Sequence, residues 1–175
     1  MRPKVFSPES AAGQALTAWW SGLSERRGER AALARCHGPA EVVATLEFHA
    51  AFARHFAQVL DTQRLHRPAM PAVLGLLSGV RKADERRSLG KVLAQGAAGG
   101  RGLSNLRFRR LLQAEDIQDL YALLRRAIAL VDRAAPLLET AELVYLWSLP
   151  EPRQRLRQNL AFDYFENLSP EQRKR

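Results

Sequence analysis

The sequence has 175 residues, close to the size of one domain, and its 46% hydrophobic content is enough for a core without disulfides or metals. Cys36 is the single cysteine, so no intramolecular disulfide can form, and together with His37 it supplies too few ligands for structural zinc. Because there is neither a secretion signal nor a run of about 18 apolar residues, we expect a cytoplasmic protein. A formal charge of +9 indicates a polyanionic partner.

Apolar residues recur at helical spacing almost throughout the chain, and no stretch shows the two-residue alternation of a strand. We therefore predict an all-α fold. It is expected to comprise two small helical bundles, residues 1–85 and 86–175, joined by a basic, glycine-containing segment.

In the first bundle, Ser7 predicts an N-cap with Pro8 at the first helical position, and this helix is expected to end near residues 22–24. A shorter helix follows and stops at the pair Gly38-Pro39. A third helix is expected from that pair onward. Its predicted apolar face is Val42, Leu46, Phe52, Phe56 and Leu60. His49 falls within this face and is interpreted as a structural residue.

The next helix carries Val73 to Val80, and residues 96–102, with four glycines, form the clearest linker. The most regular pattern is the apolar face from Ile117 to Val131, which predicts a long helix with acidic residues at its positive end. Two more helices are expected beyond it. The tail from Ser169 is predicted to be frayed.

Positive charge is concentrated between Arg81 and Arg110, where nine basic residues face two acidic ones. Within residues 103–112, the helical angle of 100° per residue places three arginines opposite an apolar anchor. The arginines are Arg107, Arg109 and Arg110, and the anchor is Phe108, Leu111 and Leu112. Because solvated faces usually mix signs of charge, this arginine face indicates contact with phosphates.

The sequence offers no candidate for catalysis or metal binding. No nucleophile elbow, P-loop or Cys-His signature occurs. His49 and His55 are six residues apart, which turns them to different helix faces. Asp116 and Asp119 are explained by the helix dipole. We expect neither an enzyme nor a bound cofactor.

Several short motifs occur in a characteristic order along the chain. They are Trp19-Trp20, Arg30 to Arg35, Ser88 to Leu93, Arg107 to Leu112, Leu124-Arg125-Arg126 and Tyr164-Phe165. In this order the chain resembles the CasB family, the small subunit of the type I-E CRISPR complex Cascade. The resemblance covers most of the chain.

The resemblance implies a non-catalytic protein of two helical bundles that assembles as a pair along Cascade. Members hold the target and displaced strands of the R-loop by their backbones. The implied partners are guide RNA, target DNA, the displaced single strand, a second copy of the chain and other Cascade subunits. With Arg109 and Arg110 added from the helical pattern, the predicted nucleic-acid-binding residues are Arg30, Arg35, Lys91, Arg107, Arg109, Arg110 and Arg125.

Two other functions fit a basic helical chain. A helix-turn-helix regulator would read one duplex site through the major groove, so it would show sequence preference. A helical adaptor would use its positive face to bind an acidic protein, and it would be insensitive to nucleic acid at low salt.

Overall fold

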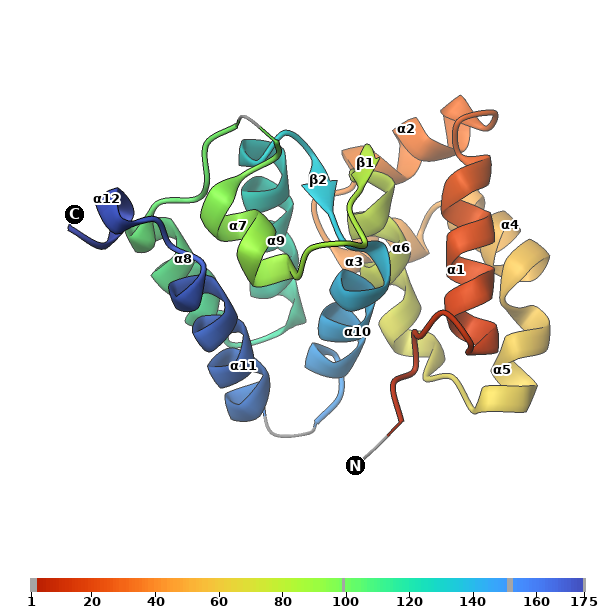
Figure 1. Ribbon diagram of the computed structural model, residues 1–175. Helices are drawn as coiled ribbons and strands as arrows, with labels where there is room; N and C mark the ends of the chain where they lie inside the picture. The colour runs from red at the N-terminus through yellow and green to blue at the C-terminus, as the bar shows by residue number, and fades with distance from the viewer. Residues whose placement is uncertain (1–2, 99, 151–152, 175) are drawn as a thin grey trace.

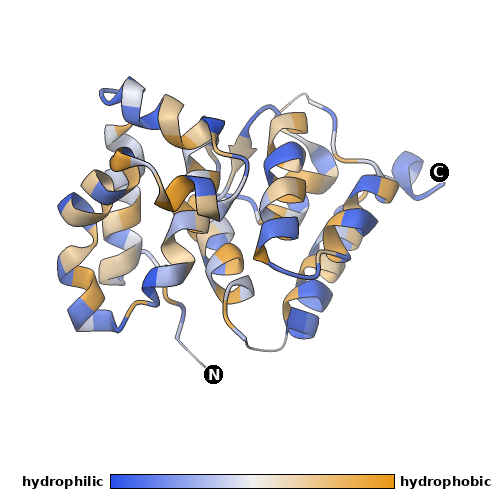
Figure 2. Cartoon of the chain, turned by 180° about the vertical axis from the view of Figure 1, so that it is seen from behind, coloured by the Kyte–Doolittle hydropathy of each residue, from blue (hydrophilic) through white to orange (hydrophobic). Residues whose placement is uncertain are grey.

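The computed structural model describes residues 3–98, 100–150 and 153–174. Helices dominate these residues, which confirms the all-α prediction. The one departure is a two-stranded parallel sheet in which β1 (Lys82–Ala83) pairs with β2 (Ala134–Ala135). Figure 2 shows apolar and polar residues sharing most of the helices, as expected of helices that cover a core with one face. No helix in the described ranges is long and apolar enough to cross a membrane.

The N-terminal helices gather at one end of the molecule (Figure 1). They are α1 (Ala11–Gly22), α2 (Arg27–Arg35), α3 (Pro39–Val43), α4 (Leu46–His55) and α5 (Ala57–Gln63). The predicted start of the first helix is wrong. Ser10, not Ser7, is the N-cap, and its side chain accepts from the Gly13 N–H at 2.9 Å. Residues 7–10 instead form a separate turn, in which the Ser10 N–H donates to the Ser7 carbonyl at 3.1 Å.

The single helix expected after Gly38-Pro39 is three helices instead. Thr45 caps α4 by accepting from the Phe48 N–H, and this break changes the helical phase. Leu46, predicted to be buried, is therefore 80% exposed, whereas Phe48 is 3% exposed. His49 is also exposed, with its Nε2 2.7 Å from the Val43 carbonyl oxygen, so it lies outside the core.

The helix α6 (Met70–Ser78), preceded by the 3-10 turn η1 (Arg67–Ala69), lies at the centre of the fold, and all of its residues are buried. It packs against α2 and α3 and also against the C-terminal helices α9 and α10. At Gly75, a Cβ atom would lie 2.5 Å from a Val42 methyl group and 2.6 Å from the Tyr121 hydroxyl. Glycine thus permits the close approach of three helices.

Most of the C-terminal helices lie toward the other end of the molecule (Figure 1). They are α7 (Leu89–Gln95), α8 (Asn105–Leu112), α9 (Ile117–Leu130), α10 (Leu137–Trp147), α11 (Arg153–Glu166) and α12 (Pro170–Arg173). The tail predicted to be frayed is helical. Ser169 and Gln172 form a capping box, and the Gln172 amide donates to the Ala94 carbonyl at 2.8 Å, which ties α12 to α7.

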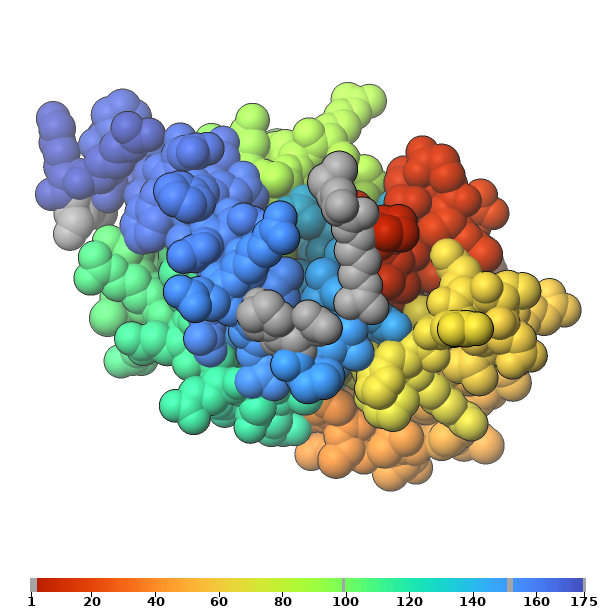
Figure 3. Space-filling model, turned by 90° about the horizontal axis from the view of Figure 1, so that it is seen from below, coloured from red at the N-terminus to blue at the C-terminus, as the bar shows by residue number. Residues whose placement is uncertain are grey.

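One continuous apolar core extends through both ends of the chain. In Figure 1 the helix α10 lies between the two groups of helices, which Figure 3 shows side by side from below, and it contacts α1 and α6 as well as α9 and α11. The division into bundles at residue 85 stays a prediction.

The packing of α7 against α11 is organised by Asp163. Its carboxylate accepts from the Ser88 hydroxyl at 2.6 Å and from the Gly90 N–H at 2.8 Å. Ser88 is the N-cap of α7 and Gly90 lies in its first turn, where the helix dipole also favours a negative charge. Asp163 therefore holds together two segments more than 70 residues apart.

We predict that Asp163→Ala lowers the free energy of unfolding by about 2 to 3 kcal/mol, because hydrogen bonds to a charged group are lost at a half-buried position. Urea unfolding followed by circular dichroism measures this change. The matched control is Glu166→Ala on the same helix, an exposed carboxylate at the negative helix end. Equal losses in both variants would contradict the role of Asp163.

Candidate nucleic-acid interface

The arginine face of α8 is oriented by an apolar anchor, as predicted. Phe108 is fully buried, and its ring stacks on Tyr164 of α11 with a centroid separation of 3.6 Å. The Tyr164 hydroxyl donates to the Leu103 carbonyl at 2.7 Å, which fixes the chain just before the Ser104 N-cap of α8. The three arginines of the helix are all exposed as a consequence.

The first arginine-lined pocket lies between α8 and α9 and has a volume of about 450 Å³. Three of its eight lining residues are arginines, namely Arg107, Arg110 and Arg126. The other five are leucine or alanine. Arg107 and Arg110 line the same pocket because they are three residues apart and share one side of α8.

The second pocket, of about 440 Å³, lies where α2, the end of α6 and α9 meet. Five arginines line it, and the remaining lining residues are small or aliphatic. These arginines are Arg35, Arg81, Arg125, Arg126 and Arg133. Arg126 and Ala129 border both pockets, so the two pockets adjoin. We call the seven arginines of the two pockets the arginine surface.

Tertiary contacts bring the arginine surface together from distant parts of the chain. The Arg125 guanidinium donates to the Ala34 carbonyl at 2.9 Å, which joins α9 to the last turn of α2. The Arg133 carbonyl accepts from the Arg81 N–H at 2.8 Å next to the small parallel sheet. Arg133 has φ of 57°, in the left-handed region, which turns the chain sharply after α9.

The positive charge of this surface is not neutralised by any ion pair within the described residues. Among the described residues, none of the ion pairs includes an arginine of either pocket, and no acidic residue lines the pockets. Burial, followed by the positive charge of Arg81, lowers the pKa of the nearby Arg30 guanidinium. Such a cationic concavity attracts anions and concentrates them.

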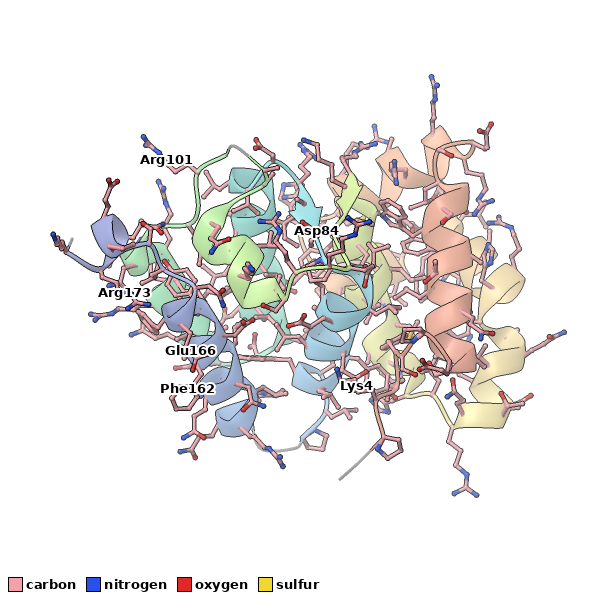
Figure 4. All side chains as sticks on the ribbon, in the orientation of Figure 1. Lys4, Asp84, Arg101, Phe162, Glu166 and Arg173 are labelled. Carbon is pink, nitrogen blue, oxygen red and sulfur yellow. The ribbon has the colours of Figure 1, made fainter. Side chains whose placement is uncertain are left out.

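A larger cavity of about 580 Å³ beside α10 and α11 has a different character. Its lining combines the acidic Glu85, Glu139, Glu142 and Asp163 with the basic Lys4, Arg86 and Arg87, of which Lys4 is labelled in Figure 4. Burial raises the pKa of Glu139 there. Because its charges are mixed, this cavity suits a polyanion less than the arginine surface does.

The structure brings together Arg35, Arg107, Arg110 and Arg125 from the residues predicted by sequence. It does not place the other three in either pocket. Arg30 lies 5.6 Å from the Trp20 ring centroid, Lys91 is half-buried in the first turn of α7, and Arg109 is exposed elsewhere on α8. Their part in binding stays a prediction.

Three residues of the arginine surface were not predicted as binding residues, although each carried a signal. Arg126 follows Arg125 in the same motif, and Arg81 begins the basic segment. For Arg133 the only signal in the sequence was its positive charge. None could be assigned from the sequence, because their convergence depends on the pairing of β1 with β2 and on the packing of α9 against α6. Arg101 projects outward from the loop before α8 (Figure 4) and lines neither pocket.

The lining of both pockets contains only Arg, Leu, Ile, Ala and Gly side chains. No nucleophile, general base or carboxylate is present there. Within the described ranges no group of three or more metal-ligating side chains occurs. The chemistry that this arrangement offers is ionic and hydrogen-bonded contact with anions.

Arg125 is expected to have a structural role that its neighbour Arg126 lacks. We predict that Arg125→Ala lowers the free energy of unfolding by about 1.5 kcal/mol, because the half-buried Arg125 loses its hydrogen bond to the Ala34 carbonyl. Arg126→Ala, the control, should change stability by less than about 0.5 kcal/mol, since Arg126 is exposed. Chemical denaturation of both variants measures the difference. Indistinguishable variants would show that the contact contributes nothing to stability.

Comparison with known proteins supports the resemblance found in the sequence. The family model for CRISPR-associated protein Cse2 matches residues 29–165, a span that contains every arginine of the arginine surface. No curated protein matches the chain. The match covers well over half of the chain and confirms the resemblance to the CasB family. The chain therefore belongs to the CRISPR-associated protein Cse2 family, the small subunit of CRISPR Cascade.

Proposed function

We propose that this protein is a non-catalytic subunit that binds nucleic-acid backbone without sequence specificity and stabilises the R-loop of a type I-E Cascade. The observation that carries the proposal is the arginine surface, in which seven arginines line two adjoining pockets that contain no acidic residue. Guanidinium groups make forked hydrogen bonds that match the geometry of phosphate oxygens. Contacts of this kind position a strand without reading its bases.

The extent of the arginine surface favours a strand over a single anion. Its arginines come from α2, from the ends of both short strands, from α9 and from α8, so they border a path rather than a point. A path suits the target or the displaced strand of an R-loop, or the guide RNA paired within it. Small and aliphatic residues between the arginines leave the charge accessible.

R-loop formation gives such contacts a function. The exchange of a DNA duplex for an RNA–DNA heteroduplex is nearly balanced in free energy, so a few additional phosphate contacts decide whether the open state persists. In this proposal other Cascade subunits and a second copy of the chain continue the path beyond this one. Because phosphate contacts do not depend on sequence, every target could be held equally well.

The test removes three arginines that border the first pocket. If each neutralises one phosphate of a single strand, Arg107→Ala, Arg110→Ala and Arg126→Ala combined should reduce the slope of log affinity against log salt concentration by about 2. Fluorescence anisotropy with labelled single strands of unrelated sequence measures the slope, and the loss of affinity should be equal for all of them. In assembled Cascade the R-loop lifetime should shorten, while guide-RNA loading is retained.

The matched control carries the same loss of charge outside the arginine surface. Arg86→Ala, Arg155→Ala and Lys174→Ala remove three exposed basic residues, and the salt slope should change by much less. Circular dichroism verifies that both triple variants remain helical. An equal change of slope in the two would reject the arginine surface as the binding path, and a strong sequence preference would favour a regulator instead.

A further inference from the structure

The pocket between α8 and α9 has a property that phosphate binding does not require. Five of its eight lining residues are leucine or alanine, among them Leu103, Leu123 and Ala129. Leu130, another lining residue, is 49% exposed, so apolar surface stays in contact with solvent beside three arginines. A site for phosphate alone needs only the cations. The apolar walls indicate that part of the ligand is itself apolar.

We propose that this pocket receives a nucleobase of the bound single strand while Arg107, Arg110 and Arg126 hold the phosphates on either side. This inference rests on the proposed function and adds a ligand group to it. A nucleotide combines a flat, weakly polar base with an anionic phosphate, which matches a pocket that combines apolar walls with cations. Guanidinium planes can also stack on the face of a base.

The chemistry of the pocket explains how a base could be bound without being identified. Apart from the three arginines, no lining side chain carries a hydrogen-bond donor or acceptor. Burial of the base face is available to all four bases, whereas discrimination would need polar groups at their edges. The base site therefore agrees with binding that ignores sequence.

The position of the pocket also suits a strand that continues past it. Arg126 and Ala129 are shared with the second pocket, where four further arginines follow. A strand with one base seated between α8 and α9 could thus extend its backbone toward α2. The main competing occupant is an apolar side chain of another protein. Three unpaired cations and no acidic residue at the pocket favour a ligand that carries its own negative charge.

The experiment compares two probes with the same phosphates. One is a thymidine oligonucleotide, and the other is a strand of equal length with abasic residues throughout. The full-length protein should bind the thymidine strand at least about 5-fold more tightly, since burial of one base is worth roughly 1 kcal/mol or more. Both strands should give the same salt slope, because their phosphate contacts are the same.

Two variants locate the base within the pocket. Leu130→Trp fills the space from a half-exposed position that lines the first pocket but not the second, so it should reduce the affinity for the thymidine strand to the level of the abasic strand and leave abasic binding unchanged. Leu130→Ala removes part of the apolar wall and should act in the same direction to a smaller extent. The control is Leu106→Ala, which alters an exposed leucine of α8 outside the pocket and should change neither affinity.

The outcomes separate this inference from the proposed function. Equal binding of both strands by the unaltered protein would reject the base site, and so would a Leu130→Trp variant that weakens both strands equally. In either case the salt slope and its dependence on the arginines would still support backbone binding. A salt slope that stays unchanged in the arginine variants would reject the proposed function itself.

Discussion

Burial of α6 is the constraint on which the rest of the structure depends. A helix with every residue buried must be covered on all sides, and α2, α3, α9 and α10 all pack against α6. This arrangement sets α2 beside α9. The last turn of α6 contributes Leu76 to the floor of the second pocket, with Gly79 just beyond it. The helix α6 thus belongs to the core of the protein and also lines part of its arginine surface.

The arginine surface has an electrostatic cost that the fold must tolerate. Seven cations that form no ion pair within the described residues repel one another in the free protein, and the charge of Arg81 also acts on the nearby Arg30. The apolar core on the inner faces of α8 and α9 offsets the cost. Binding of a polyanion would relieve the repulsion. The positive charge that destabilises the free protein therefore favours the binding of a polyanion.

The short sheet contributes more to the site than its length suggests. It pairs Lys82 with Ala134 and thereby places Arg81 and Arg133 at one edge of the second pocket. The chain reaches this pairing through Asp132 and Arg133, which both adopt positive φ. Non-glycine residues in this region carry strain, which persists where surrounding contacts hold the backbone in place. Here the pairing with the chain at Arg81 and Lys82 supplies those contacts.

The sequence by itself determined the helical class, the anchor of α8 and the family. The helical period states which side of its own helix a residue occupies, so Phe108 and Leu111 could be assigned to the core and Arg107 and Arg110 to the surface. The same period does not indicate which other helix packs against that residue. Only tertiary packing decided that Arg126 joins Arg107 and Arg110. The starts of α1 and α4 were set by local capping at Ser10 and Thr45, which the apolar period does not reveal. Contacts between distant segments depend on the mutual burial of several helices. A single short stretch of sequence does not include all of these helices and so cannot predict their packing.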